Sequence, residues 1–238
     1  MWQGKTVCVI LPTYNEKDSI RKNINEFEDL GIIDKIIVVN NNAVSGTSEE
    51  VAKTTAIEVH ETIQGYGAAI QRGFREAKED LIFVCEPDDT FVTTDVYKFL
   101  AYIDQMDVVY GSRTIQYLIW EGANMGWFLR FGNWSVAKLM EILYNTPSLS
   151  DVGCTFRLIK RSALERMIDD FRIKSNFFGP EMILLSKWKK LKFIQLPVNY
   201  KVRIGESKAT GSLKKSIIIG MQMIWLILSF PFRGYKRD

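Results

Sequence analysis

Three carboxylates follow an apolar run near the middle of the chain. Glu86, Asp88 and Asp89 come directly after Leu81–Cys85, in the stretch FVCEPDDTFV. Carboxylates this close together at the mouth of a buried strand repel one another unless a positive charge lies among them. Hard oxygen ligands of this kind suit Mg²⁺ or Mn²⁺. One of these carboxylates could instead cap the following helix, and Asp89 is the best candidate for that role.

Short apolar runs alternate with helical patterns around these carboxylates. Nearly continuous β-branched runs predict buried parallel strands, and the segments between them have helical periodicity. The expected strands are 6–11, 35–39, 57–59, 81–85 and 107–110, and the expected helices are 19–30, 48–53, 68–78 and 95–103. This alternation predicts an α/β layered domain with a mostly parallel central sheet. Ligands of such sheets bind beyond the carboxyl ends of the strands.

The residues that follow the expected strands are polar at five places. They read LPTYNE, VVNNNAVSGT, VHETIQGYG, CEPDDTF and YGSR. Five polar ends, several of them glycine-rich or acidic, indicate a binding site at this edge. The second half of the chain is less regular. It predicts a long aromatic helix over 124–144, a strand and a helix before 167, a helix at FGPEMILLSKW and a strand at KFIQLPVNY.

The composition is that of an ordinary globular protein with unevenly distributed charge. Of 238 residues, 47% are hydrophobic and 25% are charged, which fits one sizeable domain with a core. The net charge is +3, yet the chain from 198 onward holds eight Lys or Arg and two acidic residues. That basic tail suits phosphates or an anionic membrane surface, and nothing indicates a nucleic-acid partner. The single cysteines Cys8, Cys85 and Cys154 predict buried thiols in a reducing cytosol.

Six fragments, in order, resemble the motifs of one enzyme family. They are LPTYNE at 11–16, IIVVNNN at 36–42, QGYGAAI at 64–70, EPD at 86–88, DVGCTFRLIKRSAL at 151–164 and RIGESK at 203–208. Each fragment alone is weak, but their order and spacing together are a strong signal. The chain resembles the family 2 glycosyltransferases. It is most similar to the branch with dolichyl-phosphate mannose synthase and polyprenyl-phosphate sugar transferases.

The resemblance implies a GT-A-like layered domain that transfers a sugar from a nucleotide-diphosphate sugar, with inversion and with Mg²⁺ or Mn²⁺ bridging the diphosphate. Glu86 and Asp88 fall on the family's metal motif, so the resemblance implies that Asp88 holds the ion with Glu86 in support. A polyprenyl or dolichyl phosphate is the expected acceptor, and a sugar or small-molecule hydroxyl is the alternative. A second alternative is a non-catalytic protein that binds a nucleotide sugar. The Gln-x-x-Arg-Trp string of processive synthases does not occur, so a single transfer is expected.

The first two strand ends carry the expected nucleoside contacts. In the family, the turn with Pro12, Tyr14 and Glu16 cups the nucleoside, although a plain strand-to-helix turn explains these residues equally well. Asn40 and Asn41 stand where Asp is common in the family. Asn both donates and accepts hydrogen bonds, whereas an ionised Asp only accepts, so the nucleotide preference stays open.

Two further segments are expected to contact the donor. Gly65 and Gly67 precede a helix, where the backbone can approach a ligand and the helix N-terminus can face negative charge, although packing alone also explains them. Arg203, Ser207 and Lys208 resemble a basic loop that closes over phosphates in this branch, with a solvated loop as the alternative.

The acceptor side is expected to involve the segment around 151–157 and the helix at 178–188. The resemblance implies that Asp151 orients an acceptor group or that Arg157 binds phosphate, while a structural ion pair for Arg157 is equally possible. Glu181 falls where many relatives carry a catalytic base, which a hydroxyl acceptor needs and an ionised lipid phosphate does not. Arg113, in GSR, is a second candidate for the phosphate cluster.

The C-terminal stretch is apolar with basic flanks. The expected division is a catalytic domain over 1–211 and a helical segment over 212–238. The apolar part, 216–230, is too short for a membrane span of about 20 residues. Its basic flanks and Trp225 favour a helix lying on a membrane surface, with a core helix or a dimer contact as the alternatives. The expected location is therefore cytoplasmic, on the inner face of the cytoplasmic membrane. The flanking cations are Lys214, Lys215, Arg233, Lys236 and Arg237.

Overall fold

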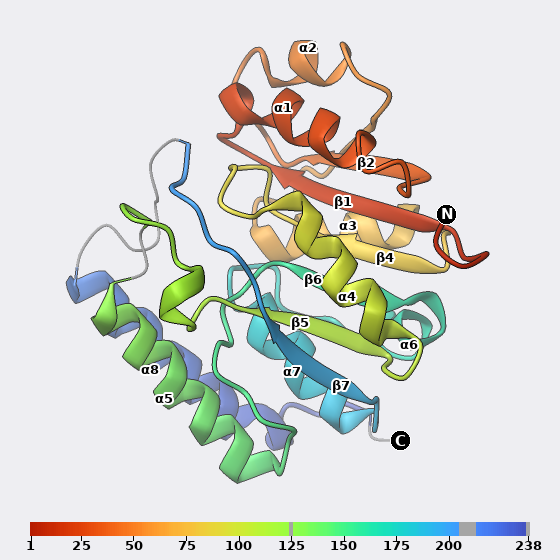
Figure 1. Ribbon diagram of the computed structural model, residues 1–238. Helices are drawn as coiled ribbons and strands as arrows, with labels where there is room; N and C mark the ends of the chain where they lie inside the picture. The colour runs from red at the N-terminus through yellow and green to blue at the C-terminus, as the bar shows by residue number, and fades with distance from the viewer. Residues whose placement is uncertain (124–125, 205–212, 237–238) are drawn as a thin grey trace.

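The computed structural model describes residues 1–123, 126–204 and 213–236 (Figure 1). Its centre is a seven-stranded sheet in the order β3-β2-β1-β4-β6-β5-β7. β6 pairs antiparallel with β4 and with β5, whereas the other neighbouring strands pair in parallel. The predicted mostly parallel α/β sheet is confirmed. The strands are β1 (Val7–Thr13), β2 (Lys35–Asn40), β3 (Ile57–His60), β4 (Leu81–Val84), β5 (Val108–Ser112), β6 (Arg157–Lys160) and β7 (Phe193–Pro197).

Helices cover both faces of the sheet, as its continuous apolar strands require. All seven residues of β1 are buried, and the side chains from Val7 to Leu11 alternate between two cores. One core lies under α1 and α4, which face the viewer in Figure 1, and the other lies under α3, α6 and α7 behind the sheet. The helices on the sheet are α1 (Lys17–Glu28), α2 (Thr47–Val51), α3 (Tyr66–Glu76), α4 (Val96–Ile103), α6 (Arg161–Glu165) and α7 (Phe178–Trp188).

Two long helices lie side by side beyond the sheet, at the lower left of Figure 1. α5 (Trp127–Tyr144) accounts for the predicted aromatic helix, and α8 (Leu213–Ser229) for most of the apolar C-terminal stretch. The Tyr144 hydroxyl donates a hydrogen bond to the carbonyl of Ile227, which joins the two helices. In the described part of the chain, no helix has both the length and the apolar character that a membrane crossing requires. Short 3₁₀ turns complete the chain: η1 (Thr93–Asp95), η2 (Gln116–Leu118), η3 (Ile168–Asp170) and η4 (Phe230–Phe232).

Candidate active site

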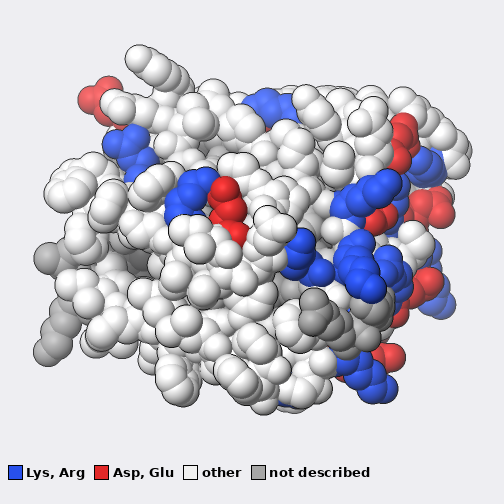
Figure 2. Space-filling model, turned by 90° about the horizontal axis from the view of Figure 1, so that it is seen from below, with Lys and Arg blue, Asp and Glu red and all other residues white. Residues whose placement is uncertain are grey.

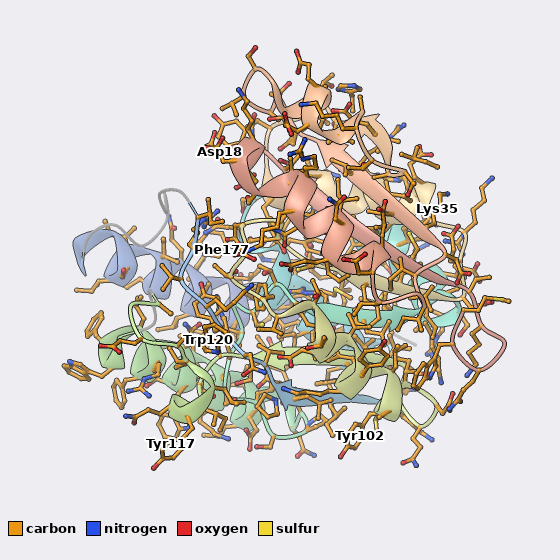
Figure 3. The ribbon with its side chains drawn as sticks, turned by 45° about the horizontal axis from the view of Figure 1, so that its top comes forward. Asp18, Lys35, Tyr102, Tyr117, Trp120 and Phe177 are labelled. Carbon is orange, nitrogen blue, oxygen red and sulfur yellow. The ribbon has the colours of Figure 1, made fainter. Side chains whose placement is uncertain are left out.

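The carboxyl ends of the parallel strands meet at one edge of the sheet. Thr13, the last residue of β1, pairs in register with Asn40, the last residue of β2. β4 runs parallel to β1 and leads into Glu86 and Asp88 at the same edge. Lys35, at the start of β2, lies at the opposite end of the molecule in Figure 3. The predicted gathering of the polar strand ends is therefore what the topology produces.

Asp88 and Glu16 are bridged by one arginine. The Asp88 Oδ1 atom accepts hydrogen bonds from the Thr90 backbone N–H at 3.1 Å and from its hydroxyl at 2.5 Å. The Asp88 Oδ2 atom lies 3.2 Å from Arg203 Nε, and Arg203 Nη2 lies 3.2 Å from Glu16 Oε1. Asp88 is only 1% exposed. The hydrogen bonds from Thr90 fix the orientation of its carboxylate, and the Arg203 guanidinium balances its charge.

The carboxylates at this edge outnumber the cation that bridges them. Burial and the neighbouring Asp88 raise the pKa of the half-buried Glu86 to about 8. Burial also raises the pKa of Asp88, although Arg203 and Thr90 oppose the shift. Ionising Glu16, Glu86 and Asp88 together around Arg203 would therefore concentrate negative charge at this edge, and a divalent cation would relieve that cost.

These carboxylates fit a metal ion that takes some of its ligands from the protein and the others from a bound substrate. Asp88 offers a fixed carboxylate, and Glu86 a second one two residues away. Within residues 1–123, 126–204 and 213–236, no group of three or more His, Cys, Asp or Glu residues forms a complete metal site. Mg²⁺ in particular is commonly bound by one or two carboxylates together with phosphate oxygens and water. Asp88 with Glu86 matches that pattern.

The prediction that Asp89 caps the following helix is wrong. η1 starts without a side-chain cap, and Asp89 instead has a left-handed backbone with φ of +64°. Its carboxylate pairs with Lys22 Nζ and Lys201 Nζ, each at 2.7 Å. The backbone of Ile204 also donates to the carbonyl of Asp88 at 3.0 Å. The contacts of Lys201 with Asp89 and of Ile204 with Asp88 hold the segment 201–204 beside the acidic loop. This segment contains Arg203, so these contacts position its side chain.

The turn after β1 is closed by its own carboxylate. Pro12 lies within the buried end of the strand, and Tyr14 is 37% exposed. The Glu16 Oε2 atom accepts hydrogen bonds from the backbone N–H groups of Tyr14 at 2.7 Å and Asn15 at 2.8 Å. Glu16 therefore shapes the turn and pairs with Arg203 through its other oxygen.

Asn40 and Asn41 are both engaged within the protein. The Asn41 amide donates to the carbonyls of Glu61 and Ile63 at 2.8 Å each, and its oxygen accepts from the Gly65 N–H at 2.8 Å. An ionised Asp has no donor for those two carbonyls. The Asn40 amide donates to Glu58 at 2.8 Å. The departure from the family's Asp thus has a structural reason, because Asn41 holds the loop 61–65.

Gly65 and Gly67 serve the packing of a neighbouring loop. A Cβ at Gly65 would lie 2.2 Å from the carbonyl oxygen of Lys174, and one at Gly67 would lie 2.4 Å from that of Ile173. The Gly67 and Ala68 N–H groups at the start of α3 donate to carbonyls in this loop, at 3.2 and 3.0 Å. These N–H groups are therefore bonded within the protein, and the glycines allow the loop 173–175 to approach.

Arg113 and Asp151 form a buried bidentate ion pair. Arg113 Nε lies 2.8 Å from Asp151 Oδ2, and Arg113 Nη2 lies 3.0 Å from Oδ1. The backbone N–H groups of Arg113 and Gly153 also donate to this carboxylate. Burial alone would raise the pKa of Asp151, but Arg113 and the N–H groups outweigh it and hold that pKa below its usual value. Asp151 therefore fixes Arg113, whose guanidinium lies over the Tyr200 ring at 5.4 Å.

An Asp151→Asn variant would leave the Arg113 guanidinium without its counter-charge. We expect a loss of about 3–5 kcal/mol in the free energy of unfolding at neutral pH, measured by urea denaturation. Because the folded-state pKa of Asp151 is depressed, its stabilisation is present above the unfolded pKa of about 3.9 and is lost as the pH falls through the folded value. The gap between wild type and variant should therefore narrow below about pH 4.

Glu165→Gln is the matched control for that measurement. Glu165 is an exposed partner of Arg161, so its removal should leave the unfolding transition near that of wild type. An Asp151→Asn protein as stable as this control would contradict the structural role of the pair.

Glu181 is buried at the first turn of α7 and is bonded on several sides. Its carboxylate accepts hydrogen bonds from the Tyr235 hydroxyl at 2.6 Å and from the N–H groups of Arg172 and Ile173 at 3.0–3.2 Å. Burial raises its pKa, although these hydrogen bonds oppose the shift. Arg172 also lies over the Tyr235 ring at 4.5 Å. Glu181 thus connects α7 and the loop before it to the C-terminal segment.

A cavity of about 780 Å³ extends from Glu86 to the two outer helices. Three arginines line it near Glu86: Arg113, Arg157 and Arg203. The walls toward α5 and α8 are mainly apolar. They include Phe128, Phe131, Val136, Ile217, Ile219, Met221, Met223 and Ile224. The arrangement suits a ligand with an anionic head and an apolar body.

Several lining residues were not expected from the sequence. Tyr66, Thr155 and Tyr200 reach the cavity from α3, from the loop before β6 and from the segment after β7. Tyr66 and Thr155 stand inside the motifs QGYGAAI and DVGCTFR, so their place among motif residues was the available signal. Ser207 and Lys208 lie outside the described residues, and their expected contacts stay a prediction.

Comparison with known proteins supports this architecture. Residues 8–168 match the model of the family described as Glycosyl transferase family 2. An uncharacterized glycosyltransferase of Mycobacterium tuberculosis is 27% identical over 229 residues, which are 95% of this chain and 99% of the relative. The undecaprenyl-phosphate mannosyltransferase of Micrococcus luteus is 24% identical over 229 residues, which are 90% of this chain and 92% of that protein.

Solved structures show the same fold. Glucosyl-3-phosphoglycerate synthase of Mycobacterium tuberculosis, in complex with Mn²⁺, UDP and glucosyl-3-phosphoglycerate, superposes with a TM-score of 0.70. The sequences are 16% identical, and the match covers 95% of this chain and 80% of that one. The same enzyme with Mn²⁺, UDP-glucose and phosphoglyceric acid superposes with a TM-score of 0.69. At these identities the likeness establishes the GT-A fold.

Proposed function

The chain belongs to glycosyl transferase family 2, and from that premise we propose that it transfers a sugar from a nucleoside-diphosphate donor to a lipid phosphate at a membrane surface. The observation that carries the proposal is one continuous cavity, which runs from Glu86 and Arg203 past Arg113 to the apolar walls of α5 and α8. A metal-dependent donor site and an acceptor with an apolar chain would meet within it.

The donor half of the proposal rests on the acidic edge of the sheet. Asp88 and Glu86 would hold a divalent cation, which supplies the positive charge that the departing diphosphate needs. Arg203 is attached beside these carboxylates and would pair with the diphosphate through its fork of N–H donors. Pro12, Tyr14 and Glu16 lie at the adjoining end of β1, where we place the nucleoside. The solved relatives that bind Mn²⁺ with UDP or UDP-glucose support this half.

The acceptor half rests on the chemistry of the cavity. An anionic head would face the arginines, and a polyprenyl chain would follow the apolar walls between α5 and α8. The Micrococcus luteus relative is an undecaprenyl-phosphate mannosyltransferase, which supports this acceptor class. A phosphate is already ionised at neutral pH and can attack the anomeric carbon without a base. Attack from the face opposite the leaving diphosphate would invert that carbon.

A Glu181→Gln variant tests whether the reaction uses a base at this position. Glu181 is not among the cavity-lining residues, and its carboxylate already accepts hydrogen bonds from three neighbouring residues. We expect turnover with a polyprenyl phosphate to stay within about threefold of wild type, because no proton has to be removed from the acceptor. Steady-state rates at equal folded concentration provide the measurement. A fall in the steady-state rate by two or more orders of magnitude, with the fold intact by circular dichroism, would show that Glu181 acts as a catalytic base.

The outer helices are proposed to rest on the membrane. Large apolar side chains are exposed along both: Trp134 is 46% and Phe131 59% exposed on α5, and Trp225 is 68% exposed on α8. Figure 2 shows the underside, where the part toward α5 and α8 is largely uncharged apart from a few charged side chains, and most Lys and Arg gather toward the right. Amphipathic helices with Trp and Phe on one face bind the bilayer interface.

Sedimentation with vesicles that contain anionic lipid measures this binding. The double variant Trp134→Ser, Trp225→Ser removes exposed apolar area from each helix. Its partition coefficient from water onto the vesicles should therefore fall by about tenfold or more. Tyr102→Ser is the matched control, because Tyr102 is an exposed aromatic residue of α4, away from α5 and α8 in Figure 3. Equal binding by all three proteins would refute the docking face.

The function itself is tested by product formation. The purified chain is incubated with nucleotide sugars, Mn²⁺ and a short polyprenyl phosphate in detergent, and sugar-linked lipid phosphate is detected by mass spectrometry. The proposal expects one donor to give a product that is absent without metal and absent when the alcohol replaces the phosphate. Transfer to a soluble hydroxyl acceptor in place of the lipid phosphate would overturn the acceptor assignment.

A further inference from the structure

Three polar atoms in the same cavity are buried and have no hydrogen-bond partner. They are the Tyr66 hydroxyl, the Thr155 hydroxyl and the Arg157 Nε atom, and the absence holds across the described parts of the chain. All three residues line the cavity described above. A buried polar group without a partner costs folding free energy, so three such groups on residues that line one cavity indicate a ligand that completes their hydrogen bonding.

Arg157 is also buried without a counter-charge. It is 1% exposed, and its Nη2 atom donates to the Cys154 carbonyl at 2.5 Å. Its Nη1 atom lies 3.5 Å from the Met182 sulfur, and its guanidinium lies 5.7 Å from the centre of the Tyr110 ring. None of these neighbours is a carboxylate, and the described residues contain no ion pair to Arg157.

The other two arginines of the cavity differ in this respect. Arg113 is paired with Asp151, and Arg203 is paired with Asp88 and Glu16. A buried guanidinium carries its charge at any physiological pH, so it needs an anion within reach. A neutral ligand, such as the hydroxyls of a sugar, would leave that charge unbalanced. Among the three, Arg157 is the arginine whose position calls for a bound anion.

The surrounding groups define what kind of anion fits. The Tyr66 and Thr155 hydroxyls and the Arg157 N–H can all donate, and phosphate oxygens accept several hydrogen bonds at once. Gly179 also lines the cavity beside this arginine, and a Cβ there would lie 3.1 Å from Arg157 Nη2. The glycine therefore leaves room next to the guanidinium that any larger residue would restrict.

We infer that Tyr66, Thr155 and Arg157 form a subsite for a phosphate monoester at the polar end of the cavity, separate from the Asp88 edge proposed for the donor diphosphate. The inference rests on the proposed function, because it assigns the acceptor's phosphate to these residues. The ester group of that phosphate would point along the cavity. Its apolar walls favour a lipid chain over a small soluble group such as glycerol.

Binding to the full chain, without metal or nucleotide, tests the subsite. The probes are farnesyl phosphate, farnesol and glycerol 3-phosphate, each titrated by calorimetry in the same detergent. Wild type should bind farnesyl phosphate at least tenfold more tightly than farnesol, because only the phosphate meets the arginine. It should also bind farnesyl phosphate more tightly than glycerol 3-phosphate, which assigns the source to a lipid. Tighter binding of glycerol 3-phosphate would overturn the lipid source.

Two conservative variants locate the contact. Thr155→Val and Tyr66→Phe keep the shape of each side chain and remove its hydroxyl. Each variant should lower the affinity for farnesyl phosphate by about fivefold to tenfold and leave the affinity for farnesol unchanged. Tyr97→Phe is the matched control, since Tyr97 bonds to the Leu30 carbonyl outside the cavity. Arg157→Gln should abolish the preference for phosphate if it folds, and the two conservative variants keep the test valid if it does not.

The failure of this inference is distinguishable from failure of the proposed function. If both conservative variants bind farnesyl phosphate as tightly as wild type, or wild type does not prefer phosphate to the alcohol, the subsite is wrong. Binding of UDP in the presence of Mn²⁺ is measured on the same samples. That binding should be equal in wild type, Thr155→Val and Tyr66→Phe, and its loss in these variants would mean that the residues contact the donor instead.

Discussion

An Asp88→Asn variant should lose essentially all sugar transfer while keeping its fold. Asp88 is the buried carboxylate that Thr90 orients toward the acidic edge, so its replacement removes the fixed ligand of the proposed divalent ion. Without that ion the diphosphate departs with its charge unbalanced, and we expect turnover to fall by roughly 10³-fold or more. The measurement is the initial rate at saturating donor, with circular dichroism and thermal unfolding as checks on the fold.

Asp18→Asn is the matched control for this variant. Asp18 is an exposed carboxylate in the first turn of α1, so its loss should leave the rate within about twofold of wild type. An Asp88→Asn protein that retains more than a tenth of the wild-type rate would show that the metal, if used, is held elsewhere.

An Arg203→Gln variant should have opposite effects on the metal and on the nucleotide. Arg203 lies between Asp88 and Glu16, where its charge competes with a divalent ion for the same carboxylate oxygens. Removing it should strengthen the binding of Mn²⁺ alone, by about threefold to tenfold. It also removes two charge-assisted donors for the diphosphate, so the affinity for UDP with Mn²⁺ and the transfer rate should each fall by about 10–100-fold.

Calorimetry of Mn²⁺ alone, and of UDP at saturating Mn²⁺, separates these two effects. Arg21→Gln is the control, because Arg21 pairs with Glu50 on the surface of α1 and α2 and should change neither value. Parallel weakening of Mn²⁺ and UDP in Arg203→Gln would contradict the competition. It would indicate instead that Arg203 supports the shape of the site.

The strands and most helices follow from local pattern, whereas the pairing of the strands does not. The apolar runs at 6–11, 35–39 and 81–85 were sufficient to predict β1, β2 and β4. The insertion of the antiparallel β6 between β4 and β5 is not encoded in any single run, because alternation of side chains says nothing about which strand lies next.

The site was predictable where a residue's neighbours are near in sequence or fixed by the resemblance. Asp88 and Arg203 lie together although 115 positions separate them, and the motif resemblance alone pointed to both. The engagement of Glu181 could not be foreseen, since its partner Tyr235 comes from the far end of the chain. Asp89 was misread because its lysine partners, Lys22 and Lys201, lie on distant segments.

The departures from the family motif have different explanations. The Asn40–Asn42 run and Glu86 were the departures that motivated the alternative of a non-catalytic protein. The Asn41 amide holds the loop 61–65, and this role is compatible with an active enzyme. Membership of a glycosyltransferase family and the enzymes among its relatives support the same conclusion. Glu86 stands where the family's metal motif has Asp, so a carboxylate is kept at this edge of the sheet. Burial and the neighbouring Asp88 raise the pKa of Glu86 to about 8.

Thermal unfolding with a panel of nucleoside diphosphates, each with and without Mn²⁺, tests the central claim most directly. A ligand that binds only the folded state raises stability, by about 2.7 kcal/mol at a concentration 100-fold above its Kd. The account predicts that at least one diphosphate raises the unfolding temperature with Mn²⁺ and much less without it, and that Asp88→Asn loses the difference. A panel without any metal-dependent shift, or a shift of equal size in Asp88→Asn, would contradict the account.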